Sequence, residues 1–307
     1  MPPVSLTRFA WLSIMAALLT IGLKAGAHFL TGSVGLLSDA LESMVNLAAA
    51  IVALIVLSIA AQPPDDEHQY GHGKAEYFSS GFEGALILVA AAGIIGTSVH
   101  RLFNLQAIEQ AGIGVVISVG ASLVNLFVAQ ILLRAGRQYN SITLEADSRH
   151  LMTDVWTSVG VVVGVGAVAL TGWAWLDPVI ALLVAINIIW AGFHLLRRSM
   201  LGLLDTALPN DEYLKVTSIL NQYQVQEGVG WHALRTRLAG PRRFVSVHLL
   251  VPDVWTVREG HDLAERVEQN IRETLSTVTV FTHVEPLSDP MAWNDTTLDQ
   301  SAPSATV

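Results

Sequence analysis

Long apolar stretches dominate the first two thirds of the chain, and each is bounded by glycine, proline or charged residues. Six of them can be delimited, at 8–30, 34–62, 78–102, 111–133, 142–171 and 174–196. An α-helix of about 20 apolar residues is long enough to cross a bilayer. The pattern therefore predicts a membrane α-helical domain of six transmembrane helices over residues 1–204.

The pattern changes at Asp205, after which the apolar runs are short and interrupted by polar positions. Helices are predicted at 209–224 and 257–276, and strands at 229–239, 242–251 and 278–286. The order αββαβ predicts a small, ferredoxin-like α+β domain over residues 205–288, with helices covering one sheet face. Residues 289–307 are rich in Ser, Thr, Asp and Pro, and a disordered tail is expected there.

Composition supports this division and excludes several functions. The chain is 52% hydrophobic and 14% charged, against a usual charged share of about 25%. A net charge of -9 without a basic run argues against nucleic acid as a partner. The sequence has no cysteine, so any metal must be held by His, Asp, Glu or Asn. An intramembrane metalloprotease would need an activating Glu beside its ligands, as in His-Glu-x-x-His, and that run does not occur.

Basic residues in the short loops predict the orientation of the six helices. Cytoplasmic loops carry an excess of Lys and Arg. Only Arg101 falls on the face opposite the termini. The face shared with the termini holds Arg8, Lys74, Arg134, Arg137, Arg197 and Arg198. Both termini and residues 205–307 are therefore expected in the cytoplasm.

Polar side chains inside two of the predicted membrane helices are candidates for function, because ionisable groups are costly there. Glu42 and Asn46 are four residues apart, as are His150 and Asp154, so each pair lies on one helix face. If the faces meet, the four side chains can hold one divalent cation in tetrahedral geometry. The alternative is hydrogen bonding between helices, which Asn often provides. Asp39 and Asp147, nearer the helix ends, have either structural roles or line an access path.

Two further groups outside the membrane helices have metal-binding character. In the loop after the second helix, Asp65, His68 and His72 are spaced by three and four residues, which suits one metal held by a turn, or a solvated loop. In the second domain, paired strands would bring histidines together. Two interpretations are then equally favoured, a metal cluster and incidental surface histidines. That cluster comprises His232, His248, His261, His283 and Glu285.

Four motifs agree in order and spacing with one known family. They are residues 36–43 (LLSDALES), 71–76 (GHGKAE), 146–154 (ADSRHLMTD) and 203–209 (LLDTALP). Together they resemble the cation diffusion facilitator family, with closest similarity to its bacterial zinc and ferrous-iron efflux branch. The resemblance covers nearly the whole chain.

The resemblance implies a homodimeric exporter of the bacterial inner membrane that exchanges a cytoplasmic divalent cation for protons by alternating access. It also implies roles for individual residues. The transport site would be Glu42, Asn46, His150 and Asp154, and the loop site would be Asp65, His68 and His72. A binuclear cytoplasmic site at the dimer interface would involve His232, His248, His261, His283 and Glu285. Lys74 and Asp205 would form a salt bridge that joins the membrane and soluble parts across the dimer.

One departure from the family concerns the second helix, which usually carries two Asp, or His and Asp. Glu42 and Asn46 leave the set with two formal negative charges, which balance one divalent cation. Zn²⁺ is the first expectation, but an oxygen-rich set also admits Fe²⁺, Mn²⁺, Co²⁺ and Cd²⁺. The altered pair keeps open an alternative class, a membrane metal sensor or scaffold that does not transport.

Overall fold

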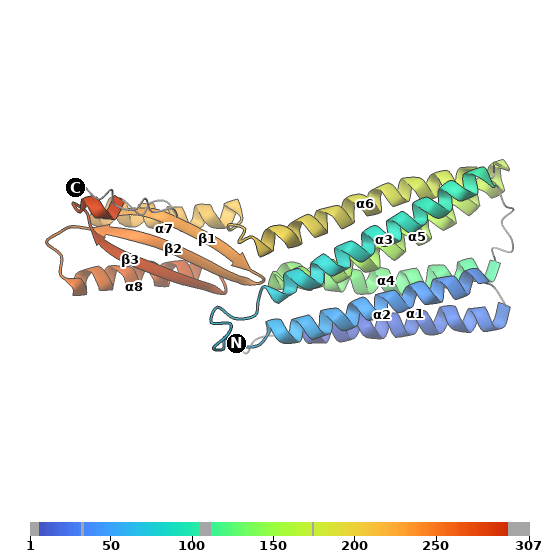
Figure 1. Cartoon of the computed structure of the whole chain (residues 1–307), viewed down its shortest axis with the longest axis horizontal. Helices are drawn as coiled ribbons and strands as arrows, with labels where there is room; N and C mark the ends of the chain where they lie inside the picture. Colours follow the sequence, from blue (N-terminus) through green and yellow to red (C-terminus); the bar gives the residue numbers. More distant parts are fainter. Residues whose placement is uncertain (1–5, 32–33, 105–111, 174, 294–307) are drawn as a thin grey trace, which may run out of the picture. The chain divides into compact units, whose positions relative to one another are not determined.

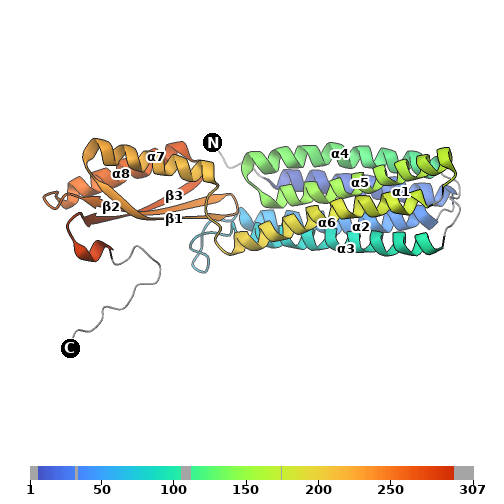
Figure 2. The same cartoon turned by 90° about the horizontal axis from the view of Figure 1, so that it is seen from above.

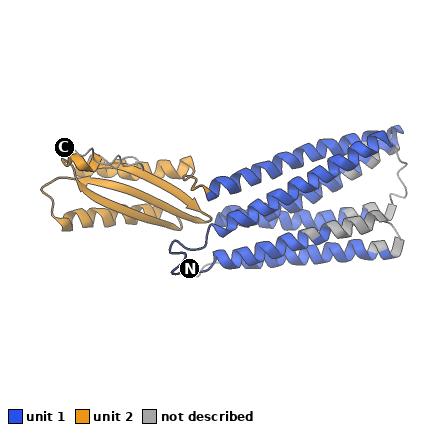
Figure 3. Cartoon of the chain, in the orientation of Figure 1, with its two compact units in different colours: residues 1–203 blue, residues 204–307 orange. Residues whose placement is uncertain are grey.

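The computed structural model describes residues 6–31, 34–104, 112–173 and 175–293. Within those ranges the side chains of 27–28, 30–31, 34–42, 45, 112–115, 118, 161, 165–166, 169 and 177 are not described. The chain divides into two compact units, Met1–Leu203 and Leu204–Val307 (Figure 3).

The first unit is a bundle of six long helices, as the apolar stretches predicted (Figure 1). They are α1 (Thr7–Thr31), α2 (Val34–Ala60), α3 (Ala75–Phe103), α4 (Gly112–Tyr139), α5 (Ile142–Thr171) and α6 (Leu176–Leu203). The most extensive packing joins α3 with α6, α1 with α2, and α4 with α5. Ser141 caps α5 by accepting a hydrogen bond from the Leu144 amide, and Gly172 ends that helix in the left-handed conformation.

The distribution of side chains in this bundle is that of a membrane domain. Large apolar residues such as Val89, Phe127 and Trp190 point outward and are exposed, whereas Ala49 and Ala53 are fully buried. Small residues allow close helix approach in lipid. At Gly84 a Cβ would lie 3.1 Å from the Leu196 backbone nitrogen, so α3 and α6 meet there at close range.

Four helical segments among the described residues are long and apolar enough to span a membrane: Thr7–Gly26, Ala75–Phe103, Val119–Tyr139 and Pro178–Leu203. The polar pairs of the sequence lie on α2 and α5, both of which include residues whose side chains are not described. Helices that carry buried polar groups in a bilayer must satisfy them against neighbouring helices or a bound cation.

The second unit is a three-stranded sheet with helices α7 (Asn210–Glu227) and α8 (Val257–Thr274) on one face (Figure 2). Strand β1 (Gly230–Ala239) pairs antiparallel with β2 (Arg242–Val251), and β2 pairs parallel with β3 (Val278–Pro286). The αββαβ order predicted from sequence is confirmed. A short 3₁₀ helix, η1 (Pro290–Trp293), lies within the segment that was expected to be disordered.

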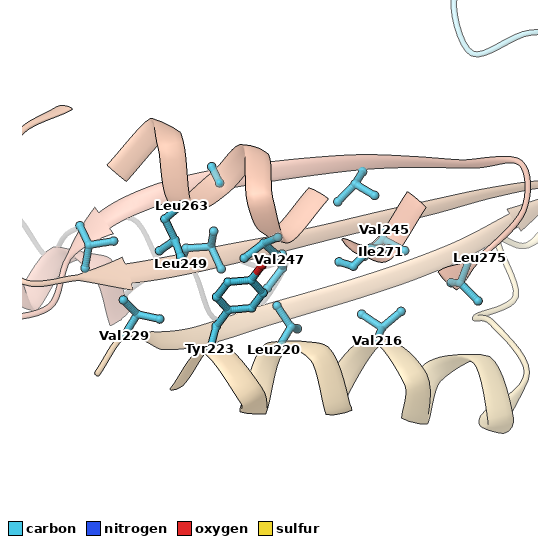
Figure 4. Packing of buried hydrophobic residues seen from close by; sticks show 14 of the residues in the cluster. Val216, Leu220, Tyr223, Val229, Val245, Val247, Leu249, Leu263, Ile271 and Leu275 are labelled. Carbon is cyan, nitrogen blue, oxygen red and sulfur yellow. The ribbon is translucent and has the colours of Figure 1, made fainter. Parts of the chain in front are cut away.

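The core of the second unit fills the space between sheet and helices (Figure 4). Val216 and Leu220 of α7 and Leu263 and Ile271 of α8 pack against the inner sheet face, to which Val247 contributes. Because the helices cover that face, the opposite face of the sheet is available for polar side chains.

Candidate metal sites

The first site lies between α2, α4 and α5 and is organised by Asn46. The Asn46 amide nitrogen donates a hydrogen bond to Asp154 Oδ2, and its amide oxygen lies 2.6 Å from His150 Nε2. Asn46 and His150 are buried. One side chain of α2, Asn46, therefore bridges both members of the polar pair on α5.

This arrangement fixes the hydrogen-bonding roles of the three side chains. An amide oxygen can only accept, so the imidazole proton is assigned to Nε2. His150 Nδ1 is buried and has no hydrogen-bond partner among the described residues. The three side chains are thus joined by hydrogen bonds, and they include three atoms of metal-donor type, namely an imidazole nitrogen, an amide oxygen and a carboxylate oxygen.

The remaining predicted members of this region fall partly outside the described side chains. Asp39 and Glu42 lie on α2 by their backbone, but their side chains are outside the described residues. Asp147 is buried on α5 and accepts a 3.0 Å hydrogen bond from Ser13 of α1 through Oδ1. Its Oδ2 is buried and without a partner in the described part of the chain.

Two buried polar residues were missed by sequence reasoning. Asn125 of α4 donates a 3.1 Å hydrogen bond from Nδ2 to Asp154 Oδ2. Glu83 of α3 is fully buried, with Ser79 at 3.5 Å from its Oε1. Asn125 has no ionisable i, i+4 partner of the kind that marked the pair on α5, and Glu83 has only Ser79 at that spacing. A polar side chain within a predicted membrane helix was the available signal for both.

The second site is in the loop between α2 and α3. Ligand atoms of Asp65, His68 and His72 lie within 4.8 Å of one another. Asp65 Oδ1 is 3.2 Å from His68 Nδ1, and Oδ2 is 3.2 Å from His72 Nε2. The hydrogen bond from the His68 backbone amide lowers the pKa of Asp65, as do the two histidines. The loop thus holds an ionised carboxylate between two imidazoles, a set suited to a divalent cation.

The third site lies on the sheet of the second unit. The strand register places His232 opposite His248, and His248 beside His283. Ligand atoms of His232, His248 and Glu285 lie within 4.8 Å of one another. His232 and Glu285 are buried, and the His248 side chain is 11% exposed. Glu285 Oε2 is 2.8 Å from His232 Nε2 and 3.4 Å from His248 Nδ1. A bulge between His232 and Arg235 interrupts the β1–β2 register beside this site.

Two other predicted members of the third site are placed differently. His283 is exposed, with Nε2 3.5 Å from Glu285 Oε1, and its ring centroid is 5.0 Å from that of His248. It lies at the edge of the triad. His261 is exposed on α8 and is not among the described residues whose ligand atoms converge here.

The residues expected to link the two parts have contacts within their own units. Lys74 Nζ lies 3.5 Å from the Leu203 carbonyl oxygen. Asp205 Oδ1 lies 3.2 Å from Arg237 Nη1. The ion pair between Lys74 and Asp205 stays a prediction.

Comparison with known proteins agrees with the two-part architecture. Residues 10–204 match the model described as "Cation efflux transmembrane domain", and residues 208–287 match ZT_dimer, "Cation efflux protein, cytoplasmic domain". The chain therefore belongs to the cation diffusion facilitator family. Divalent metal export is the activity of this class, so the chain is a transporter and not an enzyme.

Curated relatives cover nearly its full length. It is 54% identical over 297 residues to "Uncharacterized transporter sll1263" of Synechocystis sp., covering 97% of this chain and 95% of the relative. It is 31% identical over 276 residues to "Cation-efflux pump FieF" of Citrobacter koseri, covering 90% and 91%. A solved structure, the metal-bound C-terminal domain of the CzcD transporter from Thermotoga maritima, matches 26% of this chain and 92% of its own at 23% identity, with a TM-score of 0.24.

Proposed function

We propose that this protein exports a divalent metal cation, with Zn²⁺ as the first substrate, in exchange for protons. Fe²⁺, Mn²⁺, Co²⁺ and Cd²⁺ are the other cations that its oxygen-rich donors admit. The proposed ligands are Glu42, Asn46, His150 and Asp154. The main support for this proposal is that Asn46 bridges His150 and Asp154 at a buried position between membrane helices.

The bridge suggests how metal and protons exchange. Metal ligation requires a lone pair on the imidazole and an ionised carboxylate, so protons and metal compete for the same atoms. In the hydrogen-bonded arrangement, His150 Nε2 carries a proton donated to the Asn46 oxygen. A cation entering from the cytoplasm would take the place of these hydrogen bonds. Alternating access would then present the loaded site to the outside, where higher proton activity favours release.

The proposed setting is a homodimer in the bacterial inner membrane, crossed six times, with both termini in the cytoplasm. The match of residues 208–287 to the ZT_dimer model supports dimerisation. The loop site and the His232, His248 and Glu285 triad would bind the same cations on the cytoplasmic side. Bound there, metal would tighten the dimer and report the cytoplasmic load. Lys74 and Asp205 are proposed to join the two parts across that dimer.

Flux in reconstituted vesicles tests this function. Purified protein is placed in vesicles with an imposed pH gradient, and uptake is compared across Zn²⁺, Fe²⁺, Mn²⁺, Co²⁺ and Cd²⁺. We expect saturable metal movement that raises proton flux in the opposite direction and is lost in His150→Ala. His194→Ala, which removes an exposed histidine of α6, is the matched control. Metal binding without flux in the wild-type protein would favour the sensor or scaffold class instead.

A further inference from the structure

The amide of Asn125 is a buried polar group beside the transport site and is only partly hydrogen-bonded. Asn125 lies on α4, is 3% exposed, and donates through Nδ2 to the same Asp154 oxygen that accepts from Asn46. Its Oδ1 is buried and without a hydrogen-bond partner in the part of the chain that the structure describes. A buried amide oxygen left in this state calls for an explanation, and one explanation is an ion.

The geometry around Asp154 explains what that oxygen can do. Asp154 Oδ2 is held by two amide N–H groups, one from α2 and one from α4. The nitrogen and oxygen of an amide are bonded to the same carbon, so rotation of the amide by a half turn exchanges their positions. A cation bound to Asp154 would face the positions from which Asn46 and Asn125 now donate. Rotation of either amide would then replace an N–H donor by a C=O ligand at the cation.

We propose that Asn125 is a further ligand of the transported cation and determines its selectivity, an inference that rests on the proposed transport function. With Asn125, the proposed ligand set would have five donors from three helices, four of them oxygen. Zn²⁺ is well held by four ligands in a tetrahedron. Mn²⁺ and other cations that take more oxygen donors gain more from a fifth. Asn125 therefore raises transport of Mn²⁺ relative to Zn²⁺.

The side chain of Asn125 is neutral, which preserves the charge balance of the site. An amide oxygen adds a ligand without adding charge, so Asp154 and Glu42 still balance one divalent cation. It also couples α4 to metal loading, because the amide must release Asp154 when it turns to the cation.

The test compares metal preference, which a merely structural role of Asn125 would not change. Asn125→Leu keeps a similar volume and removes both polar atoms. In vesicles we expect its ratio of Mn²⁺ to Zn²⁺ transport to fall by about tenfold, which corresponds to about 1.4 kcal/mol. Asn125→Asp retains an oxygen ligand, and we expect it to keep the Mn²⁺ to Zn²⁺ ratio at or above that of the wild type. Gln130→Leu removes an exposed amide from the same helix and is the matched control.

The outcomes separate this inference from the proposed function. An unchanged ratio in Asn125→Leu, or an equal loss for both metals, would overturn the ligand role. So would an Asn125→Asp ratio as low as that of Asn125→Leu. If the wild type moves no metal, the proposed transport function is wrong, but metal binding still tests whether Asn125 is a ligand. Full-length protein carrying His72→Ala and His232→Ala, which weaken the other two sites, should bind Mn²⁺ less tightly relative to Zn²⁺ once Asn125→Leu is added.

Discussion

Arg237 of β1 forms an ion pair with Asp205, with 3.2 Å between Nη1 and Oδ1. The same guanidinium lies 4.4 Å from the ring centroid of Phe244. Asp205 follows the last membrane helix and is the residue for which we expect a salt bridge to Lys74. It therefore already has a cation within its own unit, and any contact with Lys74 shares that carboxylate with Arg237.

This sharing gives a prediction for charge reversal. Lys74→Asp and Asp205→Lys should each lower export, and the double reversal should restore only part, because the lysine introduced at position 205 would face Arg237. Adding Arg237→Glu should restore more. Half-exposed pairs of this kind contribute about 0–1 kcal/mol to stability, so the effect should appear in vesicle flux and little in thermal unfolding. Full activity in both single variants would contradict the proposed link.

A second prediction concerns the cytoplasmic triad and Trp293. The Trp293 ring centroid lies 5.2 Å from that of His232, so an ion bound at His232 lies beside an indole. Co²⁺ should quench Trp293 fluorescence in a saturable way. The chain has 8 tryptophans, and the difference between wild type and Trp293→Phe isolates the signal.

Two further variants assign that fluorescence change to the triad. His232→Ala should abolish the saturable component, and His194→Ala, in the membrane unit, should leave it intact. Equal quenching in wild type and Trp293→Phe would show that Co²⁺ does not bind beside His232.

The start of α8 gives a pH-dependent prediction. Thr256 and Glu259 form a capping box, and the hydrogen bond from the Thr256 backbone amide lowers the pKa of Glu259. A carboxyl whose pKa is lowered by folding stabilises the fold above its unfolded pKa, about 4.3. That contribution disappears as pH falls through the folded value.

Hydrogen exchange can measure the capping contribution directly. Glu259→Gln should speed amide exchange in the first turn of α8 at pH 7, and the difference from wild type should shrink below about pH 4. Glu265→Gln, an exposed change on the same helix, is the control. A difference between Glu259→Gln and wild type that is the same at both pH values would argue against the charge as its cause.

Local patterns predicted the elements well, because the apolar runs and turn residues are local signals. The αββαβ order and the opposition of His232 and His248 both follow from strand spacing and one turn. Contacts that depend on how helices rotate against one another could not be read this way. Asn125 reaches Asp154 only because α4 turns that face toward α5. Arg237 reaches Asp205 because β1 lies beside the segment that follows α6.

The transport site gives the last prediction, which turns on the charge of Asn46. Its amide now donates to Asp154 and accepts from His150. Asn46→Asp removes the donor, so two carboxylates would face each other without metal. Binding a divalent cation would relieve that repulsion, and metal affinity should rise while the metal-free protein becomes less stable. Because the added charge is neutralised by a second proton at low pH, we also expect steeper pH dependence of transport.

The remaining variants separate a ligand role for Asn46 from a bridging role. Asn46→Ala removes the bridge. If Asn46 is a ligand, the KM of this variant for transported metal should be higher than that of the wild type. His150→Ala with Asp154→Ala should eliminate flux while metal binding at the cytoplasmic triad persists, because that triad belongs to the other unit. Asp262→Ala, an exposed change on α8, is the control for loss of an acidic residue. Proton-coupled export by the double variant at the wild-type rate would exclude the mechanism, since no cation could then depend on the ligands of α5.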